Sequence, residues 1–196
     1  MTDRAADRVA DSAADPRDPR PLVGEPLALD LLNTRWSGTP VNDLLTDREG
    51  HLIWLSSAGL ADRCGEGGSG LPELREAREA LAAAVLDLDE RGEPGGAALA
   101  GLDAVLRHGR VRRTAGAGGP VDHVEVDGRQ WLAAWLAVDD FLRLLGQGAH
   151  RIKKCAHEAC ILHFLDTSQN GRRRWCSMAV CGNRAKAARH YGKARG

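Results

Sequence analysis

The chain has 196 residues, of which 43% are hydrophobic and 28% charged. That length accommodates one full domain and a second, smaller one. It is too long for a peptide hormone or a knottin. The 27 Lys and Arg side chains balance the 27 Asp and Glu side chains. The charge is unevenly distributed, however. Residues 151–196 hold 11 basic and two acidic side chains, a net charge of +9, and the first 150 residues carry a net charge of −9. Opposite charges on two parts of a chain suggest two roles, with the basic part meeting a polyanion or an acidic partner.

The first 20 residues are polar and lack the apolar stretch of a signal peptide. Nowhere does the chain approach the roughly 20 consecutive apolar residues that cross a bilayer, so we expect a cytoplasmic protein with no membrane partner. Because this composition buries too little apolar surface to offset its ordering entropy, residues 1–20 are predicted to form a disordered tail. A short solvated helix over residues 2–14 is the alternative.

Residues 21–148 are predicted to form a domain of mixed α and β structure. Leu27, Leu29 and Leu31 alternate with other residues in a period of two, which predicts a strand that ends at Asn33. The next signals are helical. Residues 46–49 have the Ser/Thr-x-x-Glu form of a capping box, so a helix is expected to start there and to end at Gly59.

Within a glycine-rich segment, Cys64 to Gly70, the six residues from Gly65 to Gly70 match the GxGxxG pattern by letter. It follows a predicted helix instead of a strand, and no Walker Lys-Ser/Thr pair comes after it. The segment is therefore predicted to be a flexible linker.

Three further helices are indicated by apolar residues at helical spacing. They are expected over residues 72–91, around residues 99–106 and over residues 130–145. Gly146 and Gly148 are expected to end the last of them. Before it, the alternating segments 110–114 and 121–127 flank a glycine-rich stretch, 115–120, and this pattern predicts a hairpin with a long loop.

The C-terminal part contains two cysteine pairs with the same internal spacing. Cys155-x4-Cys160 is followed, after 15 residues, by Cys176-x4-Cys181. Four thiolates hold Zn²⁺ tetrahedrally and leave no position for a water molecule, so the pattern predicts one structural zinc ion per chain and no hydrolytic chemistry. A segment of this size also needs a cross-link such as a bound metal ion in order to fold, because its apolar core is small. The alternatives are an iron–sulfur cluster and four unligated core cysteines.

Nearby histidines offer weaker metal-ligand candidates. His157-Glu158 begins like the HExxH motif of zinc proteases, but Ile161 stands where the second histidine belongs. His157 or His163 could replace one cysteine ligand, although four cysteines already complete a shell. Cys64 lies far away in the sequence and is interpreted as an ordinary thiol.

The residues between and after the cysteine pairs predict a small hairpin and a helix. Residues 161–165 are expected to form a strand or hairpin arm over the metal. Residues 166–171 are of types that favour turns, so a turn is expected there. Ser177 is a plausible N-cap for a helix from about Met178 to Tyr191.

A basic helix braced by a metal site is a shape that proteins insert into the major groove of DNA. The candidate DNA contacts are Arg172, Arg173, Arg174, Asn183, Arg184, Lys186 and Arg189. Arg184 is ambiguous, because it could instead hydrogen-bond the thiolates or Asp166. A solvated helix whose charges serve only solubility is the alternative.

These residues resemble the CGNR zinc finger family. The resemblance rests on Cys155 and Cys160, on Phe-Leu-Asp-Thr-Ser at 164–168, and on Arg-Arg-Trp-Cys-Ser-Met-Ala-Val-Cys-Gly-Asn-Arg-Ala-Lys at 173–186, which includes the name-giving motif at 181–184. It covers about residues 151–192.

Upstream, three shorter patterns resemble the ABATE domain. They are Leu-Ala-Leu-Asp-Leu-Leu-Asn-Thr at 27–34, Asp-Leu-Leu at 43–45 and Trp-Leu at 54–55. This α/β domain commonly precedes the finger in bacterial stress-induced transcription regulators. The resemblance implies a DNA-binding regulator whose N-terminal domain senses a signal or oligomerises, with a small-molecule effector as an open partner.

The sequence therefore predicts an α+β protein with a tail over 1–20, an ABATE-like domain over 21–148 and a zinc finger with a basic helix over 150–193. The leading function is a zinc-dependent, DNA-binding transcription regulator. The alternative is a protein- or RNA-binding adaptor. No complete catalytic constellation is found, so an enzyme is not expected, although Asp30, Asn33 and Arg35 could line a pocket.

Overall fold

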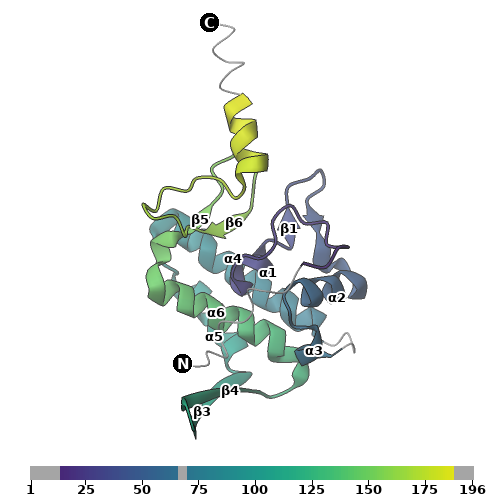
Figure 1. The fold of residues 1–196 in the computed structure, drawn as a ribbon, viewed down its shortest axis with the longest axis vertical. Coiled ribbons are helices and arrows are strands. Elements are labelled where there is room, and N and C mark those ends of the chain that lie inside the picture. Colours follow the sequence, from purple (N-terminus) through teal and green to yellow (C-terminus); the bar gives the residue numbers. More distant parts are fainter. Residues whose placement is uncertain (1–13, 66–69, 188–196) are drawn as a thin grey trace, which may run out of the picture.

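The computed structural model describes residues 14–65 and 70–187, and helices make up most of it (Figure 1). The helices are α1 (Leu27–Leu32), α2 (Arg48–Ser57), α3 (Ala61–Cys64), α4 (Leu71–Arg91), α5 (Gly96–Leu106) and α6 (Leu132–Gly148). Short 3₁₀ turns η1 (Leu44–Thr46), η2 (Arg129–Trp131) and η3 (Ala149–Arg151) connect them, and a π-helical turn η4 (Met178–Gly182) continues as an α-helix over 183–187. The predicted α+β class is confirmed.

The described strands form three separate antiparallel pairs. β1 (Arg35–Trp36) pairs with β2 (Asn42–Asp43), β3 (Gly109–Gly116) with β4 (Gly119–Val126), and β5 (Ile152–Lys154) with β6 (His163–Leu165). Two regions are named below: the N-terminal domain, residues 14–148, and the C-terminal module, residues 150–187. Figure 1 shows the module above the helices and the β3–β4 hairpin projecting at the opposite end.

The long helix α4 is the centre of the N-terminal domain, where it packs against α5 and α6. Pro72 in its first turn and Gly92 in a left-handed conformation after its end fix its limits. Its predicted apolar stripe is confirmed, since Leu74, Ala77 and Leu81 are fully buried.

The strand predicted at residues 27–32 is wrong, because this segment forms helix α1. Every residue from Leu27 to Leu31 is buried, with α6, α4 and β6 packed around the helix. A short segment that is buried on all sides leaves no polar face, so its hydrophobic pattern cannot distinguish a helix from a strand.

The disordered tail predicted for residues 1–20 is wrong for its last part, and residues 1–13 lie outside the described residues. Arg20 is buried between the carboxylates of Asp18 and Asp30, at 2.7 Å from each. The indole Nε1 of Trp54 donates to Asp30 Oδ1 at 3.0 Å. Buried charges are tolerated when they are paired and hydrogen-bonded in this way. The segment 14–20 is therefore part of the folded domain.

Helix ends and the hairpin loop differ from the prediction in detail. Asp47 caps α2 by accepting a hydrogen bond from Gly50 N–H, so Thr46 is not the cap. Helix α6 runs through Gly146 and ends at Gly148. The glycine-rich stretch 115–120 is mostly strand, since the β3–β4 ladder extends to the Gly116–Gly119 pair.

Candidate metal centre

The C-terminal module brings the four cysteines together through its small hairpin. Cys155 follows β5 directly, and its N–H donates to Leu162 O at 2.9 Å. The Cys160 N–H donates to His157 O at 2.8 Å, which closes a tight turn between the strands. Leu162 and Phe164 are buried beneath the cysteines, so the predicted hairpin arm is confirmed.

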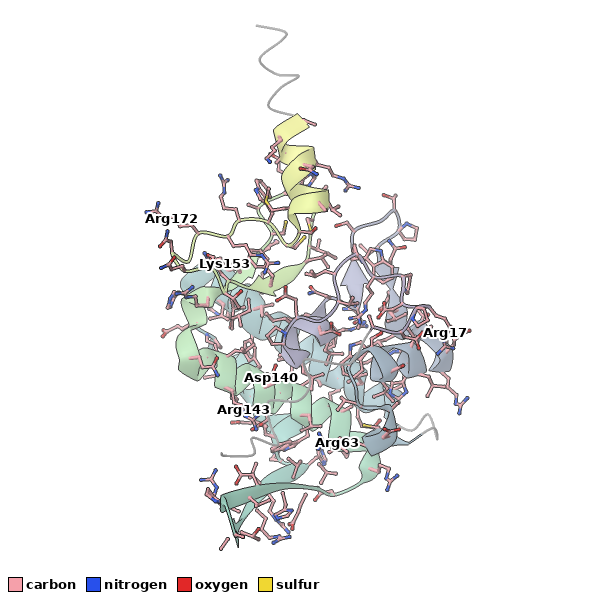
Figure 2. The ribbon with its side chains drawn as sticks, in the orientation of Figure 1. Arg17, Arg63, Asp140, Arg143, Lys153 and Arg172 are labelled. Carbon is pink, nitrogen blue, oxygen red and sulfur yellow. The ribbon has the colours of Figure 1, made fainter. Side chains whose placement is uncertain are left out.

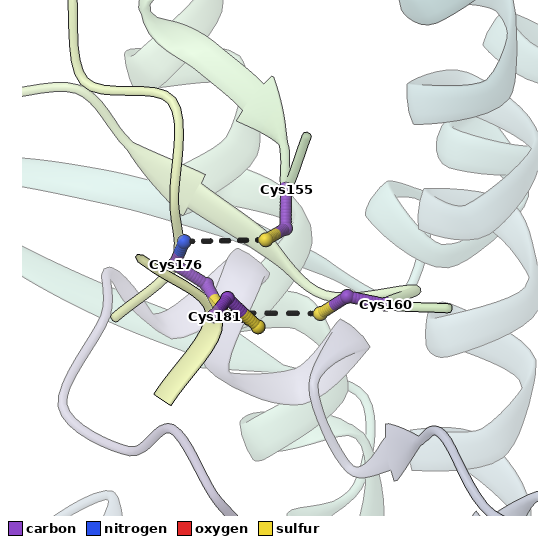
Figure 3. Close-up of side chains that lie close together, drawn as sticks. All are labelled: Cys155, Cys160, Cys176 and Cys181. Carbon is purple, nitrogen blue, oxygen red and sulfur yellow. Dashed lines mark hydrogen bonds between the residues drawn. The ribbon is translucent and has the colours of Figure 1, made fainter. Parts of the chain in front are cut away.

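The second pair of cysteines closes the site from the other side (Figure 3). Cys176 ends the loop that follows β6, and Cys181 lies in the π-helical turn η4. The Cys176 N–H also donates to Cys155 Sγ at 3.5 Å. Residues from the hairpin and from η4 therefore meet at one point, although 26 positions separate the first cysteine from the last.

The distances between the sulfur atoms fit a tetrahedral zinc ion. All four Sγ atoms lie within 4.8 Å of one another and all four residues are buried. Cys160 Sγ is 3.8 Å from Cys176 Sγ, which is 3.6 Å from Cys181 Sγ. Four Zn–S bonds of about 2.3 Å at tetrahedral angles place the sulfurs about 3.8 Å apart. The residues present fit this metal.

The electrostatics of the cluster also favour a cation. The hydrogen bond from the Cys176 thiol lowers the pKa of Cys160 to about 5. The same interaction raises the pKa of Cys176 far above its usual value, and burial raises that of Cys181 to about 11. Without a cation, the cluster thus favours the Cys160 thiolate and opposes ionisation of Cys176 and Cys181. A divalent cation would supply the missing positive charge and allow all four to ionise.

Arg173 holds the loops around the cluster together. Its guanidinium donates from Nε to Trp175 O at 3.1 Å and from Nη2 to Cys176 O at 2.6 Å. It also lies over the Phe164 ring, 4.3 Å from the centroid, and 3.4 Å from a carboxylate oxygen of Glu25. These contacts connect the metal loop to the N-terminal domain. The sequence pattern predicts Arg173 as a DNA contact, and no local signal in the sequence indicates this structural role.

Asp166 anchors the turn that precedes Arg173. Lys153 Nζ lies 2.7 Å from Asp166 Oδ2, and Ser168 donates to Oδ1 from both its N–H and its hydroxyl. The Arg173 N–H donates to Oδ2 at 3.0 Å. The Lys153 ammonium and then Ser168 hold the pKa of this carboxyl well below its usual range. Arg184 is exposed, and no described bond joins it to Asp166.

The other predicted DNA contacts lie at the surface of the C-terminal module. Arg172, Arg174, Asn183, Arg184 and Lys186 are exposed. Arg174 lies over the Trp175 ring, with its guanidinium carbon 5.3 Å from the centroid. Arg189 lies outside the described residues. Figure 2 shows Arg172 on the outer loop of the module, with Lys153 beside it.

The weaker metal-ligand candidates have other positions. His163 Nε2 lies 3.1 Å from Asp89 Oδ2, and His157 Nδ1 accepts from the Ala159 N–H. Neither histidine belongs to the metal-binding group found among the described residues. Cys64 is buried at the end of α3, and burial raises the pKa of its thiol.

Asp30, Asn33 and Arg35, the residues suggested to line a pocket, are held in polar contacts of the fold. Asp30 is buried in its ion pair with Arg20. Arg35 pairs with the carboxylates of Asp43 and Glu79 at the surface. Asn33 hydrogen-bonds the backbone of the C-terminal module, and all three residues thus serve the fold.

A helical domain followed by a small four-cysteine module defines a zinc-finger protein with an N-terminal domain. Two family models match the chain: "CGNR zinc finger" over residues 151–194 and ABATE, described as "Putative stress-induced transcription regulator", over residues 25–148. The chain belongs to the ABATE family and carries a CGNR zinc finger. No curated protein matches it. Within the described residues no helix is long and apolar enough to cross a membrane.

Proposed function

We propose that this protein is a DNA-binding transcription regulator whose C-terminal module binds one structural zinc ion and contacts duplex DNA. No catalytic step is assigned to it. The zinc ion would be held by Cys155, Cys160, Cys176 and Cys181. When bound, it supplies the cross-link that fixes the hairpin and the turn η4, because the module has few buried apolar residues of its own.

The observation that carries the DNA-binding proposal is the exposure of unopposed positive charge on this module. Arg172, Arg184 and Lys186 are exposed, whereas Asp166 is buried beneath Lys153. Glu158 is the one exposed carboxylate of the segment 150–187. Phosphates attract such a surface, and the first 150 residues, with a net charge of −9, add little to it.

Arg173 is set apart from the other basic residues in this proposal. Its guanidinium is hydrogen-bonded to backbone oxygens and half-buried, so it orders the loop that presents Arg172 and Arg174. Arg184 and Asn183 are exposed on the helix that follows Cys181, which supports a role for them in reading base edges.

Fluorescence anisotropy with zinc-loaded full-length protein and labelled duplex DNA tests this function. If about four or five phosphates are neutralised, log K falls with log salt at a slope of about −4. Arg172→Ala and Lys186→Ala should each weaken binding to all sequences and reduce the slope by about one. Absence of binding at about 50 mM salt would reject the proposal and favour the adaptor function.

A further inference from the structure

A cleft of about 490 Å³ lies at the junction of the two regions. One wall comes from the C-terminal end of α4, through Leu88 and Asp89, and from the turn η3 after α6, through Ala149 and His150. The other comes from β5 and the loop before Cys176, through Lys154 and Arg174 among others. We call this space the junction cleft. Its size falls within the range of about 300–1,000 Å³ that is typical of small-molecule sites.

Most charged side chains of the junction cleft are already paired. Lys153 Nζ binds the Asp166 carboxylate and Gly171 O. Arg173 is bound to backbone oxygens, as described above. Asp89, the one carboxylate in the lining, faces His163 Nε2 at 3.1 Å. These groups hold the walls of the cleft in place and have little capacity left for a ligand.

Two cations of the junction cleft have no anionic partner in the part of the chain that the structure describes. Lys154 and Arg174 are exposed, and within residues 14–65 and 70–187 neither forms an ion pair with a carboxylate. Both belong to the C-terminal module, and His150 adds a third group that carries positive charge when protonated. Charge-assisted hydrogen bonds from such groups are the usual means of holding a phosphate.

The remaining lining indicates what the rest of a ligand would be. Leu88 of α4, Ala149 of η3 and Ile152 of β5 provide apolar surface in the same lining. The ends of α4 and α6 lie there as well, and helix C-termini disfavour negative charge. An anionic group would therefore bind at Lys154 and Arg174, with an uncharged, partly apolar body against the helix ends.

We propose that the junction cleft binds a small phosphate-bearing molecule. The phosphate is bound by Lys154 and Arg174, and the body lies against Leu88 and Ile152. Because the lining of the cleft comes from both regions, a bound ligand stabilises the contact between the C-terminal module and the N-terminal domain. Coupled to the proposed DNA-binding function, on which this regulatory consequence rests, the ligand would change how the module is presented to DNA. A DNA phosphate could use the same two cations, and the experiment separates the two sources.

The test is isothermal titration calorimetry on zinc-loaded full-length protein without DNA, at about 50 mM salt, where screening is moderate. The probes are inorganic phosphate, pyrophosphate and adenosine monophosphate, with adenosine as the phosphate-free control. We expect the monophosphate to bind with a Kd of about 1 mM or tighter, and more tightly than phosphate or adenosine. Lys154→Ala and Arg174→Ala should each weaken this binding about tenfold, and Lys154→Arg should retain it.

Arg143→Ala is the matched control, because Arg143 is a half-exposed cation on α6 paired with Asp139. It lies far from Lys153 in Figure 2 and should leave the binding unchanged. Equal binding by wild type and the double variant at Lys154 and Arg174 would overturn the proposal. Failure of all three phosphate probes to bind would also overturn it. If Lys154→Ala then weakened DNA binding alone, Lys154 and Arg174 would belong to the DNA-binding surface. Binding of the monophosphate by a protein that fails to bind DNA would support the cleft and reject only the regulator.

Discussion

The side chain of Asn33 pairs with the backbone of His163 as a neighbouring strand would. Asn33 Oδ1 accepts the His163 N–H at 3.0 Å, and Asn33 Nδ2 donates to His163 O at 2.9 Å. Two residues further along β6, the Leu165 N–H donates to the Glu25 carboxylate at 2.9 Å. Side chains of the N-terminal domain thus satisfy the free edge of β6, which otherwise would expose unpaired backbone groups.

Replacing Asn33 by Ala should destabilise the junction of the two regions. Both hydrogen-bond partners are backbone groups in a buried position, and each would be left unsatisfied, at a total cost of about 2–4 kcal/mol. Urea denaturation of the zinc-loaded chain measures this. Asn42→Ala is the control, since the exposed Asn42 amide makes one bond, to Ser37 O, and should change stability little. A wild-type midpoint in Asn33→Ala would contradict the role assigned to this pair.

The contrast between Asn33 and the cysteines explains how much the sequence could predict. The spacing of the two cysteine pairs is local and has few structural solutions, so the cluster and its hairpin were predictable. The local pattern predicts Asn33 as the end of a strand and a candidate pocket residue, because its true partner, His163, is 130 positions away in the sequence. The same limit explains α1 and Arg173: their roles come from surroundings that are distant in sequence, and the local pattern does not encode them.

The metal prediction is one zinc ion per chain, bound by the four clustered cysteines. Cys181→Ser should remove zinc, because three thiolates and a hydroxyl form a much weaker site. Metal analysis after gel filtration measures the zinc-to-protein ratio. Cys64→Ser provides the control, since Cys64 is buried in the N-terminal domain and its loss should leave the ratio at one. A variant at Cys181 that still retained full zinc through chelator treatment would disprove the assigned ligand set.

Arg172 and Arg173 are adjacent in sequence, and we expect opposite phenotypes when each is replaced by Ala. Arg173→Ala removes bonds to Trp175 O and Cys176 O next to the metal, and loss of such support typically lowers metal affinity by about 10–100-fold. Arg172→Ala removes an exposed cation and should leave zinc affinity unchanged while it weakens DNA binding. Competition with a chromogenic zinc chelator gives the first quantity and anisotropy the second. Equal zinc affinities in the two variants would show that the Arg173 contacts are dispensable.

A chain that ends at Gly148 should still fold without zinc. With the exception of Ile152, every buried residue of the main core lies upstream of this point. The truncated chain loses Ile152, the packed side chain of Leu165 and the partners of Asn33 and Glu25. It should therefore melt cooperatively, at a lower temperature than the zinc-loaded full chain, as followed by circular dichroism. Aggregation of this chain beside a stable full-length protein would mean that the two regions share one indispensable core.

The ion pair between Asp43 and Arg78 predicts a specific pH dependence. Arg78 is buried, and its Nη1 and Nη2 donate to the two oxygens of Asp43 at 2.6 and 2.8 Å. Burial alone would raise the pKa of Asp43, but the bonds from Arg78, then from the Leu45 N–H and Arg35, outweigh burial and lower the pKa. A carboxyl with a lowered pKa stabilises the fold above its unfolded value of about 3.9, and the contribution is lost as the pH falls through the folded value.

Asp43→Asn should consequently lower the free energy of unfolding by about 2 kcal/mol at pH 7, because the buried Arg78 guanidinium loses its nearest carboxylate and keeps the more distant Glu79 Oε1, 3.9 Å from its Nε. The difference between wild type and variant should be constant from about pH 7 to pH 5 and shrink below about pH 4, where Asp43 itself becomes protonated. Comparing the two proteins at each pH cancels the loss of zinc that both undergo in acid. Asp122→Asn on the β3–β4 hairpin is the matched control: its pKa is also lowered by an arginine, Arg113, but both side chains are exposed, so no measurable change is expected. If the Asp43→Asn difference persisted undiminished at pH 3, it would reflect packing at this position and not the charge of the carboxylate.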